Sequence, residues 1–310
     1  MAHARSGNGG RLQPGPAFGW FIAVAMLAVV TPIRSPGSEP AGALATDSCC
    51  GVVELRQYTL RPGQREEFIA LFDSTFAVPL DATGMTVIGQ FRDLDRPDRF
   101  VWIRGFQNMD VRPKELAAFY DSDLWRSHRN EANAVIVDSD NVLLLEPASR
   151  SSRLKDVPPR LPEGDAATDG GLIVATLYYT KPGALSDFAR LFDRSLRPKT
   201  ETAGARTVAA YMTSTHENNY PRLPTRLGEH IYVWIAGFAS PQGYADYRVK
   251  LEADRDWARA LWPSARTRLI RDPEVLRLTP TSRSRLRGVG STGANTRGTP
   301  AARSSEAELG

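Results

Sequence analysis

The chain has 310 residues, of which 42% are hydrophobic and 24% charged, the composition of a globular protein with a sizeable core. No uncharged apolar run reaches the ~18 residues of a membrane-spanning helix, and the adjacent Cys49 and Cys50 can form neither a disulfide framework nor a four-ligand zinc site. The net charge of +4 lies in the two ends, because residues 51–280 sum to zero, so no nucleic-acid partner is expected.

Residues 1–50 are predicted to be a leader that is either signal-like or non-functional. An uncharged apolar run, residues 17–30, has the length of the hydrophobic part of a signal peptide. The small-residue site Ala43–Ala45 follows well after this run ends, which is far for signal peptidase. We therefore expect a cytoplasmic protein, and the alternative is export or envelope association through residues 17–30.

An internal repeat lies between the two ends of the chain. The segment Tyr58–Asp73 matches Tyr178–Asp193 at a constant offset of 120 residues. The offset becomes 132 at the motifs VWIRGF (101–106) and VWIAGF (233–238), so the second copy contains an insertion. The residues identical in the first pair of segments are Tyr58, Pro62, Gly63, Phe68, Leu71, Phe72 and Asp73.

The repeat divides the chain into five predicted segments. These are the leader 1–50, a first repeat 51–147, a linker 148–170, a second repeat 171–280 and a disordered basic tail 281–310. The insertion in the second repeat, residues 213–229, is polar and contains two prolines. It is either a lid or partner-binding loop, or an elongated hairpin tip that costs little entropy.

Each copy is predicted to run strand–helix–strand–strand–helix–strand, from helical spacing of apolar residues and from strands rich in β-branched and aromatic residues. The first copy has Val53–Leu60, Gln64–Val78, Met85–Phe91, Phe100–Phe106, a helix containing Leu116 and Leu124, and Val137–Leu145. The second copy has Leu172–Thr180, Ala184–Thr202, Arg206–Met212, His230–Phe238, Pro241–Leu261 and Val275–Leu278.

This order of elements is that of a ferredoxin-like βαββαβ unit, an antiparallel sheet with both helices on one face. The uncovered face of each sheet needs a partner that buries it. We therefore predict an α+β fold in which the two repeats pack sheet to sheet. The product would be an intramolecular dimeric α/β barrel, closed by eight strands with the helices outside.

The first copy also resembles a known family. The segments VVELRQYTLRPGQREEF, GQFRDLDRPDRFVWIRGF and LAAFYDSDLWRSHRNEANA are similar to bacterial members of the NIPSNAP family. The resemblance is stronger over residues 52–147 than over residues 171–280. It implies the dimeric α/β-barrel superfamily, which includes cofactor-free monooxygenases, isomerases and haem enzymes. NIPSNAP proteins have no settled reaction, and eukaryotic members are associated with mitochondria and vesicle-related interactions, so the fold transfers and an activity does not.

Arginines on predicted strands mark the first copy as the better candidate for a ligand site. Arg56, Arg92 and Arg104 could hold a carboxylate or enolate oxygen through forked hydrogen bonds. Their counterparts in the second copy carry no charge and are Thr176, Met212 and Ala236. Alternatively, these arginines lie at the sheet edge and cover apolar surface with their stems.

The second helix of the first copy supplies the remaining candidates. His128 could act as a general acid or base, with Arg129 beside it on the helix. Alternatively, His128 bonds a backbone carbonyl and is structural. The other predicted binding residues, which would shape an apolar pocket, are Tyr58, Trp102, Tyr120, Trp125 and Asn133.

No metal or cofactor site is predicted, because phosphate-loop, nucleophile-elbow and metal-ligand spacings are missing from the sequence.

The expected function is binding of a small apolar or carboxylate-bearing molecule in the first repeat. Cofactor-independent chemistry of monooxygenase or isomerase type is an open option, so the sequence does not decide whether the protein is an enzyme. The alternative is a non-enzymatic interaction or scaffold protein. A homo-oligomer remains compatible with the duplication.

Overall fold

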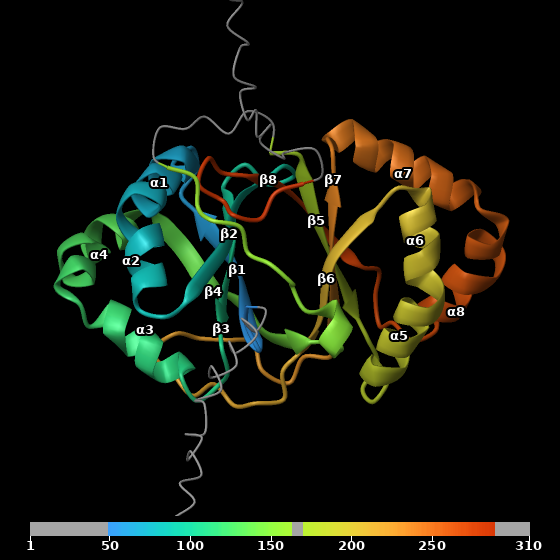
Figure 1. The fold of residues 1–310 in the computed structure, drawn as a ribbon, viewed down its shortest axis with the longest axis horizontal. Coiled ribbons are helices and arrows are strands. Elements are labelled where there is room, and N and C mark those ends of the chain that lie inside the picture. The colour runs from blue at the N-terminus through green and yellow to red at the C-terminus, as the bar shows by residue number, and fades with distance from the viewer. Residues whose placement is uncertain (1–48, 163–169, 289–310) are drawn as a thin grey trace, which may run out of the picture. The chain divides into compact units, whose positions relative to one another are not determined.

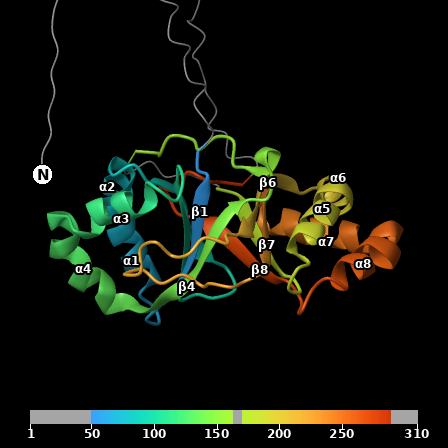
Figure 2. The same ribbon diagram turned by 90° about the horizontal axis from the view of Figure 1, so that it is seen from below.

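The computed structural model describes residues 49–162 and 170–288, so residues 1–48 of the predicted leader, residues 163–169 of the predicted linker and residues 289–310 of the predicted tail lie outside it. Eight strands close into a barrel in the order β1-β3-β2-β8-β5-β7-β6-β4. Every strand pair in the barrel is antiparallel. Helices α1–α4 cover one flank and α5–α8 the other (Figures 1 and 2). The predicted barrel of two ferredoxin-like repeats is confirmed.

The first repeat has all the predicted elements, with different helix boundaries. Its strands are β1 (Val52–Leu60), β2 (Thr86–Asp93), β3 (Arg99–Phe106) and β4 (Ile136–Pro147). Its helices are α1 (Arg65–Leu71) and α2 (Ala77–Ala82), joined by a π-helical turn (Phe72–Phe76), then α3 (Arg112–Tyr120) and α4 (Asp123–Val135). The predicted second helix is thus two helices, because the Ser122 hydroxyl accepts a hydrogen bond from the Trp125 amide at 3.1 Å and begins a new one.

The second repeat follows the same plan. Its strands are β5 (Leu172–Tyr179), β6 (Arg206–Thr213), β7 (Ile231–Phe238) and β8 (Glu274–Pro280). Its helices are α5 (Leu185–Leu191), a π-helical turn (Phe192–Leu196), α6 (Arg197–Ala203), α7 (Pro241–Ala253), a second π-helical turn (Trp257–Leu261) and α8 (Trp262–Arg266). The predicted helix Pro241–Leu261 is interrupted at Asp254, whose carboxylate caps the Trp257 amide at 2.8 Å.

Both copies enter their first helix through the same turn. Gly63 and Gly183, each preceded by a proline, have φ of 79° and 78°. A side chain is strained in this left-handed region, so glycine is required there. The π-helical turns after α1 and α5 also fall at equivalent positions, 120 residues apart. The duplication therefore extends to local backbone geometry.

Alternation along the strands separates the barrel interior from the layer under the helices. Val53 and Leu55 of β1 point into an apolar interior to which both repeats contribute. Tyr58, on the opposite face, packs among the apolar residues under the first repeat's helices. Glu54 and Arg56 share that outer face, because they alternate with the interior residues. A charged pair on the middle of a strand is therefore buried between sheet and helices.

Two short seams join the sheets. β2 pairs with β8, and β4 with β6, over three residue pairs each. Beyond β8 the chain continues beside β2, where the Leu286 amide donates to the Ile88 carbonyl at 2.9 Å. Thr281, Ser284 and Leu286 are buried. The prediction of disorder from residue 281 is thus wrong for residues 281–288, because this segment covers an otherwise unpaired strand edge.

The predicted linker also packs against the barrel over its described part. Leu154 belongs to the apolar interior. Arg160 forms an ion pair with Asp81 of α2 at 2.9 Å, and Arg285 of the C-terminal segment reaches the same carboxylate at 2.9 Å. The linker and the C-terminal segment are therefore both tied to the first repeat.

Candidate functional site

One carboxylate and three guanidiniums form a buried cluster in the first repeat. Glu54 and Arg104 are cross-strand neighbours on β1 and β3, Arg56 follows two residues after Glu54, and Arg112 comes from the start of α3. Arg56, Arg104 and Arg112 approach the Glu54 carboxylate at 2.6, 2.7 and 2.6 Å. All four side chains are at most 1% exposed.

Electrostatics keep this cluster fully ionised. Burial acts to raise the pKa of Glu54, but the guanidiniums of Arg104, Arg56 and Arg112 overcome it and hold that pKa well below its usual range. Three guanidiniums against one carboxylate leave two positive charges uncompensated within the cluster. Buried excess charge is costly unless polar or charged partners offset it.

Neutral groups supply part of that compensation. Arg112 donates to the side-chain carbonyls of Asn218 and Asn219 at 3.0 and 2.8 Å. The other two arginines donate to phenol oxygens, Arg56 to Tyr58 at 3.1 Å and Arg104 to Tyr120 at 3.3 Å. Burial raises the pKa of Tyr58, although Arg56 opposes this, so the phenol keeps its proton and can donate it to a further acceptor.

A cavity of about 90 Å³ lies beside the cluster, between the outer sheet face and the helices. Six predicted binding residues line it, namely Arg56, Tyr58, Trp102, Tyr120, Trp125 and Asn133. Four further phenylalanines line it, namely Phe68, Phe72, Phe76 and Phe119. The lining contains no histidine or carboxylate. The cavity therefore combines apolar walls with one buried cation and two phenol groups.

The Trp102 indole lines this cavity, and its N–H has no hydrogen-bond partner although the side chain is buried. Its counterpart Trp234 donates to the Thr207 hydroxyl at 3.2 Å. Val87 occupies the position of Thr207 in the first repeat, since it pairs with Arg104 as Thr207 pairs with Ala236. The first repeat thus has a buried donor for which the described residues supply no acceptor.

The insertion of the second repeat covers this site from outside. The loop 214–230 between β6 and β7 runs toward α3 along the bottom of the view in Figure 1. Tyr220 lies 6.4 Å from Tyr120 between ring centroids, and Leu223 lines the cavity. Arg222 pairs with Asp121 at 2.6 Å. We call residues 214–230 the strap.

Three predicted site residues lie away from the cavity. Arg92 faces α1, where it pairs with Glu66 at 2.5 Å. His128 is 37% exposed and contacts Glu131 at 3.3 Å through Nδ1. Arg129 is exposed on α4. None of the three lines the cavity, so a catalytic role for His128 stays a prediction that this geometry does not support.

Sequence reasoning missed Glu54, Arg112 and the strap asparagines. Glu54 could have been found, because it shares a strand face with Arg56 and its counterpart in the second copy is the apolar Val174. Arg112 had no comparable indication, since an arginine in the first turn of a helix is ordinarily exposed. The contribution of Asn218 and Asn219 depends on the path of the strap, which the sequence did not determine.

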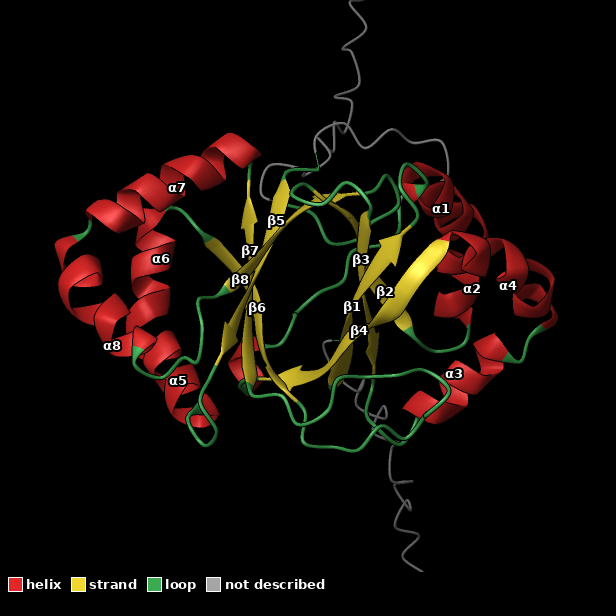
Figure 3. Ribbon diagram, turned by 180° about the vertical axis from the view of Figure 1, so that it is seen from behind, coloured by secondary structure: helices red, strands yellow, loops and turns green. Residues whose placement is uncertain are grey.

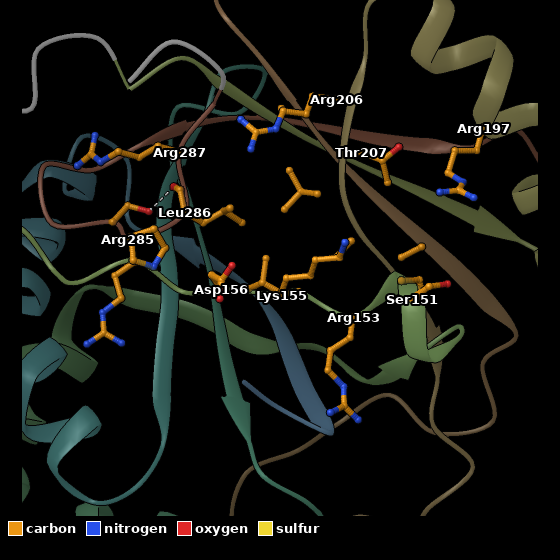
Figure 4. A pocket seen from close by; sticks show the side chains of 18 of the residues that line it. Ser151, Arg153, Lys155, Asp156, Arg197, Arg206, Thr207, Arg285, Leu286 and Arg287 are labelled. Atoms are coloured by element: carbon orange, nitrogen blue, oxygen red, sulfur yellow. Dashed lines mark hydrogen bonds between the residues drawn. The ribbon is translucent and has the colours of Figure 1, made fainter. Parts of the chain in front are cut away.

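A larger cavity, of about 720 Å³, lies between the linker, β6 and the C-terminal segment. Figure 4 shows Arg197, Arg206 and Thr207 on one side of it and Arg153 and Lys155 of the linker on another. Some of its cations already have partners: Arg197 pairs with Asp193 at 2.8 Å and Arg285 with Asp81 at 2.9 Å. It lacks the fully buried charged cluster found in the first repeat.

Within residues 49–162 and 170–288, no three His, Cys, Asp or Glu side chains are grouped so that they could hold a metal ion. None of the helices there is long and apolar enough to cross a membrane.

The family model described as NIPSNAP matches this chain twice, over residues 53–152 and 174–285, which together make up more than half of the chain. No curated protein matches the sequence significantly. Among solved structures, the chain is similar to a NIPSNAP family protein from Agrobacterium tumefaciens str. C58, with 21% identity, 37% of this chain and 98% of that chain covered, and a TM-score of 0.30.

It is also similar to a NIPSNAP domain protein from Burkholderia xenovorans, with 18% identity, 36% of this chain and 95% of that chain covered, and a TM-score of 0.29. For an anthrone oxidase-like protein the identity is 11%, the coverage 74% and 91%, and the TM-score 0.47. On the two matches to the family model, this chain belongs to the NIPSNAP family and carries two tandem copies of its domain.

Proposed function

We propose that the first repeat binds a small molecule that has an apolar body and a carboxylate or enolate oxygen. The observation that carries this proposal is the buried cluster, in which three guanidiniums surround the single carboxylate of Glu54 beside an aromatic cavity. An anion bound in the cavity would offset the excess positive charge, and charge-assisted hydrogen bonds from the buried guanidinium would compensate its desolvation cost.

The direct contact would come from Arg56, the one guanidinium of the cluster that lines the cavity. Its Nη1 is held by Glu54 at 2.6 Å and its Nε by Tyr58 at 3.1 Å, so the side chain is fixed before a ligand arrives. Such preorganisation lowers the entropy cost of binding. The Trp102 indole N–H offers a second donor that a ligand oxygen would satisfy.

The aromatic side chains that line the cavity favour an apolar or aromatic body for the rest of the ligand. Phe72, Phe76 and Trp125 present ring faces and edges to the cavity, and such sites favour apolar or aromatic bodies. The chemistry that this lining favours is stabilisation of an enolate oxygen by Arg56, a contribution suited to cofactor-independent reactions of monooxygenase or isomerase type. The lining contains no histidine or carboxylate that could act as a base. The base that removes a proton would therefore have to be a group of the substrate itself or a water molecule.

Native mass spectrometry of the full-length protein as purified tests the proposal. The expected result is a retained organic acid, seen as added mass and identified after denaturation. Arg56→Met should abolish retention, because it removes the only cation that lines the cavity. Arg92→Met is the matched control, since Arg92 pairs with Glu66 away from the cavity.

Retention of the same acid by Arg56→Met would place the ligand elsewhere. Loss of the ligand in both variants would indicate a general effect of removing an arginine from the strands, and the proposed contact would be wrong.

A further inference from the structure

The second repeat has its own cavity at the position equivalent to the first site. Its volume is about 330 Å³, and it lies between strands β5, β7 and β8 and helices α7 and α8. Figure 3 shows these helices against one flank of the barrel. Thr176, Tyr178 and Trp234 line this cavity as Arg56, Tyr58 and Trp102 line the smaller one.

In the second repeat, uncharged residues stand at all four positions that form the charged cluster of the first repeat. The cross-strand pair Glu54–Arg104 becomes Val174–Ala236, and Arg56 opposite Trp102 becomes Thr176 opposite Trp234. Arg112, in the first turn of α3, corresponds to Tyr244 near the start of α7 at the same offset of 132 residues as the β3 and β7 motifs. Replacing long guanidiniums by Thr176 and Ala236 also makes room, which agrees with the larger volume.

Half of the residues that line this cavity are aromatic. Trp234 and Tyr178 come from the sheet, and Tyr247 comes from α7. Trp257 and Trp262 lie parallel, with 5.9 Å between ring centroids and 9° between planes. Both tryptophans line the cavity, and Trp262 is half-buried. Flat walls of this kind suit a flat ligand that stacks on them.

The lining offers no uncompensated charge. Its only charged side chains, Arg248 and Glu252, pair with each other at 2.6 Å on α7. The Trp234 N–H is already bonded to Thr207, in contrast to the free indole N–H of Trp102. An anion entering here would be desolvated without gaining a partner.

We propose that the cavity of the second repeat binds an uncharged planar aromatic molecule, stacked against the Trp257 and Trp262 side of the wall. The two repeats would then be two sites of opposite preference, one for an anion and one for a neutral ring system. This proposal rests on the second repeat alone and does not depend on ligand binding in the first.

A pair of fluorescent probes tests it on the full-length protein. N-phenyl-1-naphthylamine is uncharged, and 1-anilinonaphthalene-8-sulfonate adds only a sulfonate to the same skeleton. The uncharged probe should bind with a fluorescence increase, and the sulfonate should bind the same site at least about tenfold more weakly. Trp262→Ala should weaken the uncharged probe about tenfold, whereas Trp262→Phe should keep the affinity within about threefold, since a ring remains.

Trp125→Ala is the control, because it removes a half-buried tryptophan from the cavity of the first repeat. It should leave binding of the uncharged probe unchanged. The proposal is overturned if Trp262→Ala binds the probe as the unaltered protein does, if Trp125→Ala weakens it instead, or if the sulfonate binds the Trp262-dependent site as tightly. Absence of any Trp262-dependent binding overturns it as well.

Discussion

Glu54 is the residue on which the first site depends. Among residues 49–162 and 170–288 it is the only carboxylate that contacts Arg56, Arg104 and Arg112, at 2.6–2.7 Å, and it is fully buried. Removing one partner of a buried ion pair leaves an uncompensated charge, which is far more costly than losing an exposed pair. The same residue therefore stabilises the fold and orients the arginine that faces the cavity.

Glu54→Gln should lower the free energy of unfolding by about 3–5 kcal/mol, because three buried guanidiniums would remain without an anion. Urea denaturation of the two proteins measures this. Glu66→Gln is the matched control, since the Glu66 side chain is 60% exposed and pairs with Arg92 at the surface. It should cost less than about 1 kcal/mol. Losses of equal size would contradict the account of the cluster.

The stabilisation by Glu54 should also depend on pH in a definite direction. Its guanidinium partners hold the pKa of Glu54 below the usual range in the folded protein, so its stabilising effect is complete above the unfolded-state pKa of about 4.3. It is lost as the pH falls from there toward the folded-state pKa. The difference in unfolding free energy between the unaltered protein and Glu54→Gln should be constant from about pH 5 to 8 and shrink below about pH 4. A difference that grows on acidification would be the opposite result.

At this scale, six of the ten predicted site residues line the cavity, and the reason is physical. Arg56, Trp102 and Tyr120 lie on faces fixed by strand and helix periodicity, which a sequence displays. His128 and Arg129 lie on α4, where His128 is half-buried, Arg129 is exposed and neither lines the cavity. The predicted single helix through Leu116 and Leu124 did not show that Ser122 begins a separate helix.

Among the elements, the strap links the two repeats structurally. It belongs to the second repeat in sequence, but Asn218, Asn219 and Tyr220 contact the first. Asn218 and Asn219 hold Arg112, and Asn219 also donates to the Met109 carbonyl at 2.6 Å. The sequence located the insertion and left its role open. Its path could not be predicted, because these contacts join residues more than 100 positions apart.

Replacing both strap asparagines, Asn218→Ala with Asn219→Ala, should loosen the strap, because Arg112 loses its two neutral acceptors. Backbone amides of residues 214–225 should then exchange hydrogen faster by mass spectrometry. His216→Ala is the control in the same loop, since His216 is 57% exposed and contacts only Glu146 in an ion pair. Unchanged exchange in the double variant would mean that the strap is held by other contacts.

The C-terminal segment 281–288 is a second element with a structural role, since it pairs with the edge of β2. Its amino-acid composition did not predict this role. Its Ser, Arg and Gly content predicted disorder, yet Leu286 enters the barrel interior and its amide bonds to β2. The strand edge also receives the Thr281 amide, and Arg285 pairs with Asp81, so a short polar segment is held by backbone hydrogen bonds, an ion pair and one apolar side chain together. The composition of a window cannot show that such an edge is available.

Leu286→Ala should therefore lower the free energy of unfolding by about 2–5 kcal/mol, as other buried leucines do. Ser282→Ala, at an exposed position of the same segment, should change it by less than about 0.5 kcal/mol. Thermal or urea unfolding distinguishes the two. An effect of Leu286→Ala as small as that of Ser282→Ala would show that the seam between β2 and β8 is stable without this segment.

At the scale of the whole molecule, the duplication explains why the whole fold was predictable, whereas Glu54, Arg112 and the strap contacts were not. Two copies of one βαββαβ unit each leave an apolar sheet face bare, and a shared interior is the direct way to bury both. The spacing of apolar residues along the strands and helices and the internal sequence repeat are sufficient to predict this arrangement. The sites lie outside the barrel, under the helices, where the copies have diverged from Glu54 and Arg56 to Val174 and Thr176.

The most direct test of the central claim is calorimetric titration of the full-length protein with benzoate and with its uncharged isostere benzamide. A charge-assisted hydrogen bond is worth roughly 1.5–3 kcal/mol, so benzoate should bind about 10–100-fold more tightly. The preference should disappear in Arg56→Met and persist in Arg92→Met, because Arg56 lines the cavity and Arg92 does not. Equal affinities for the two compounds, or a benzoate preference that survives Arg56→Met, would contradict an anion site in the first repeat.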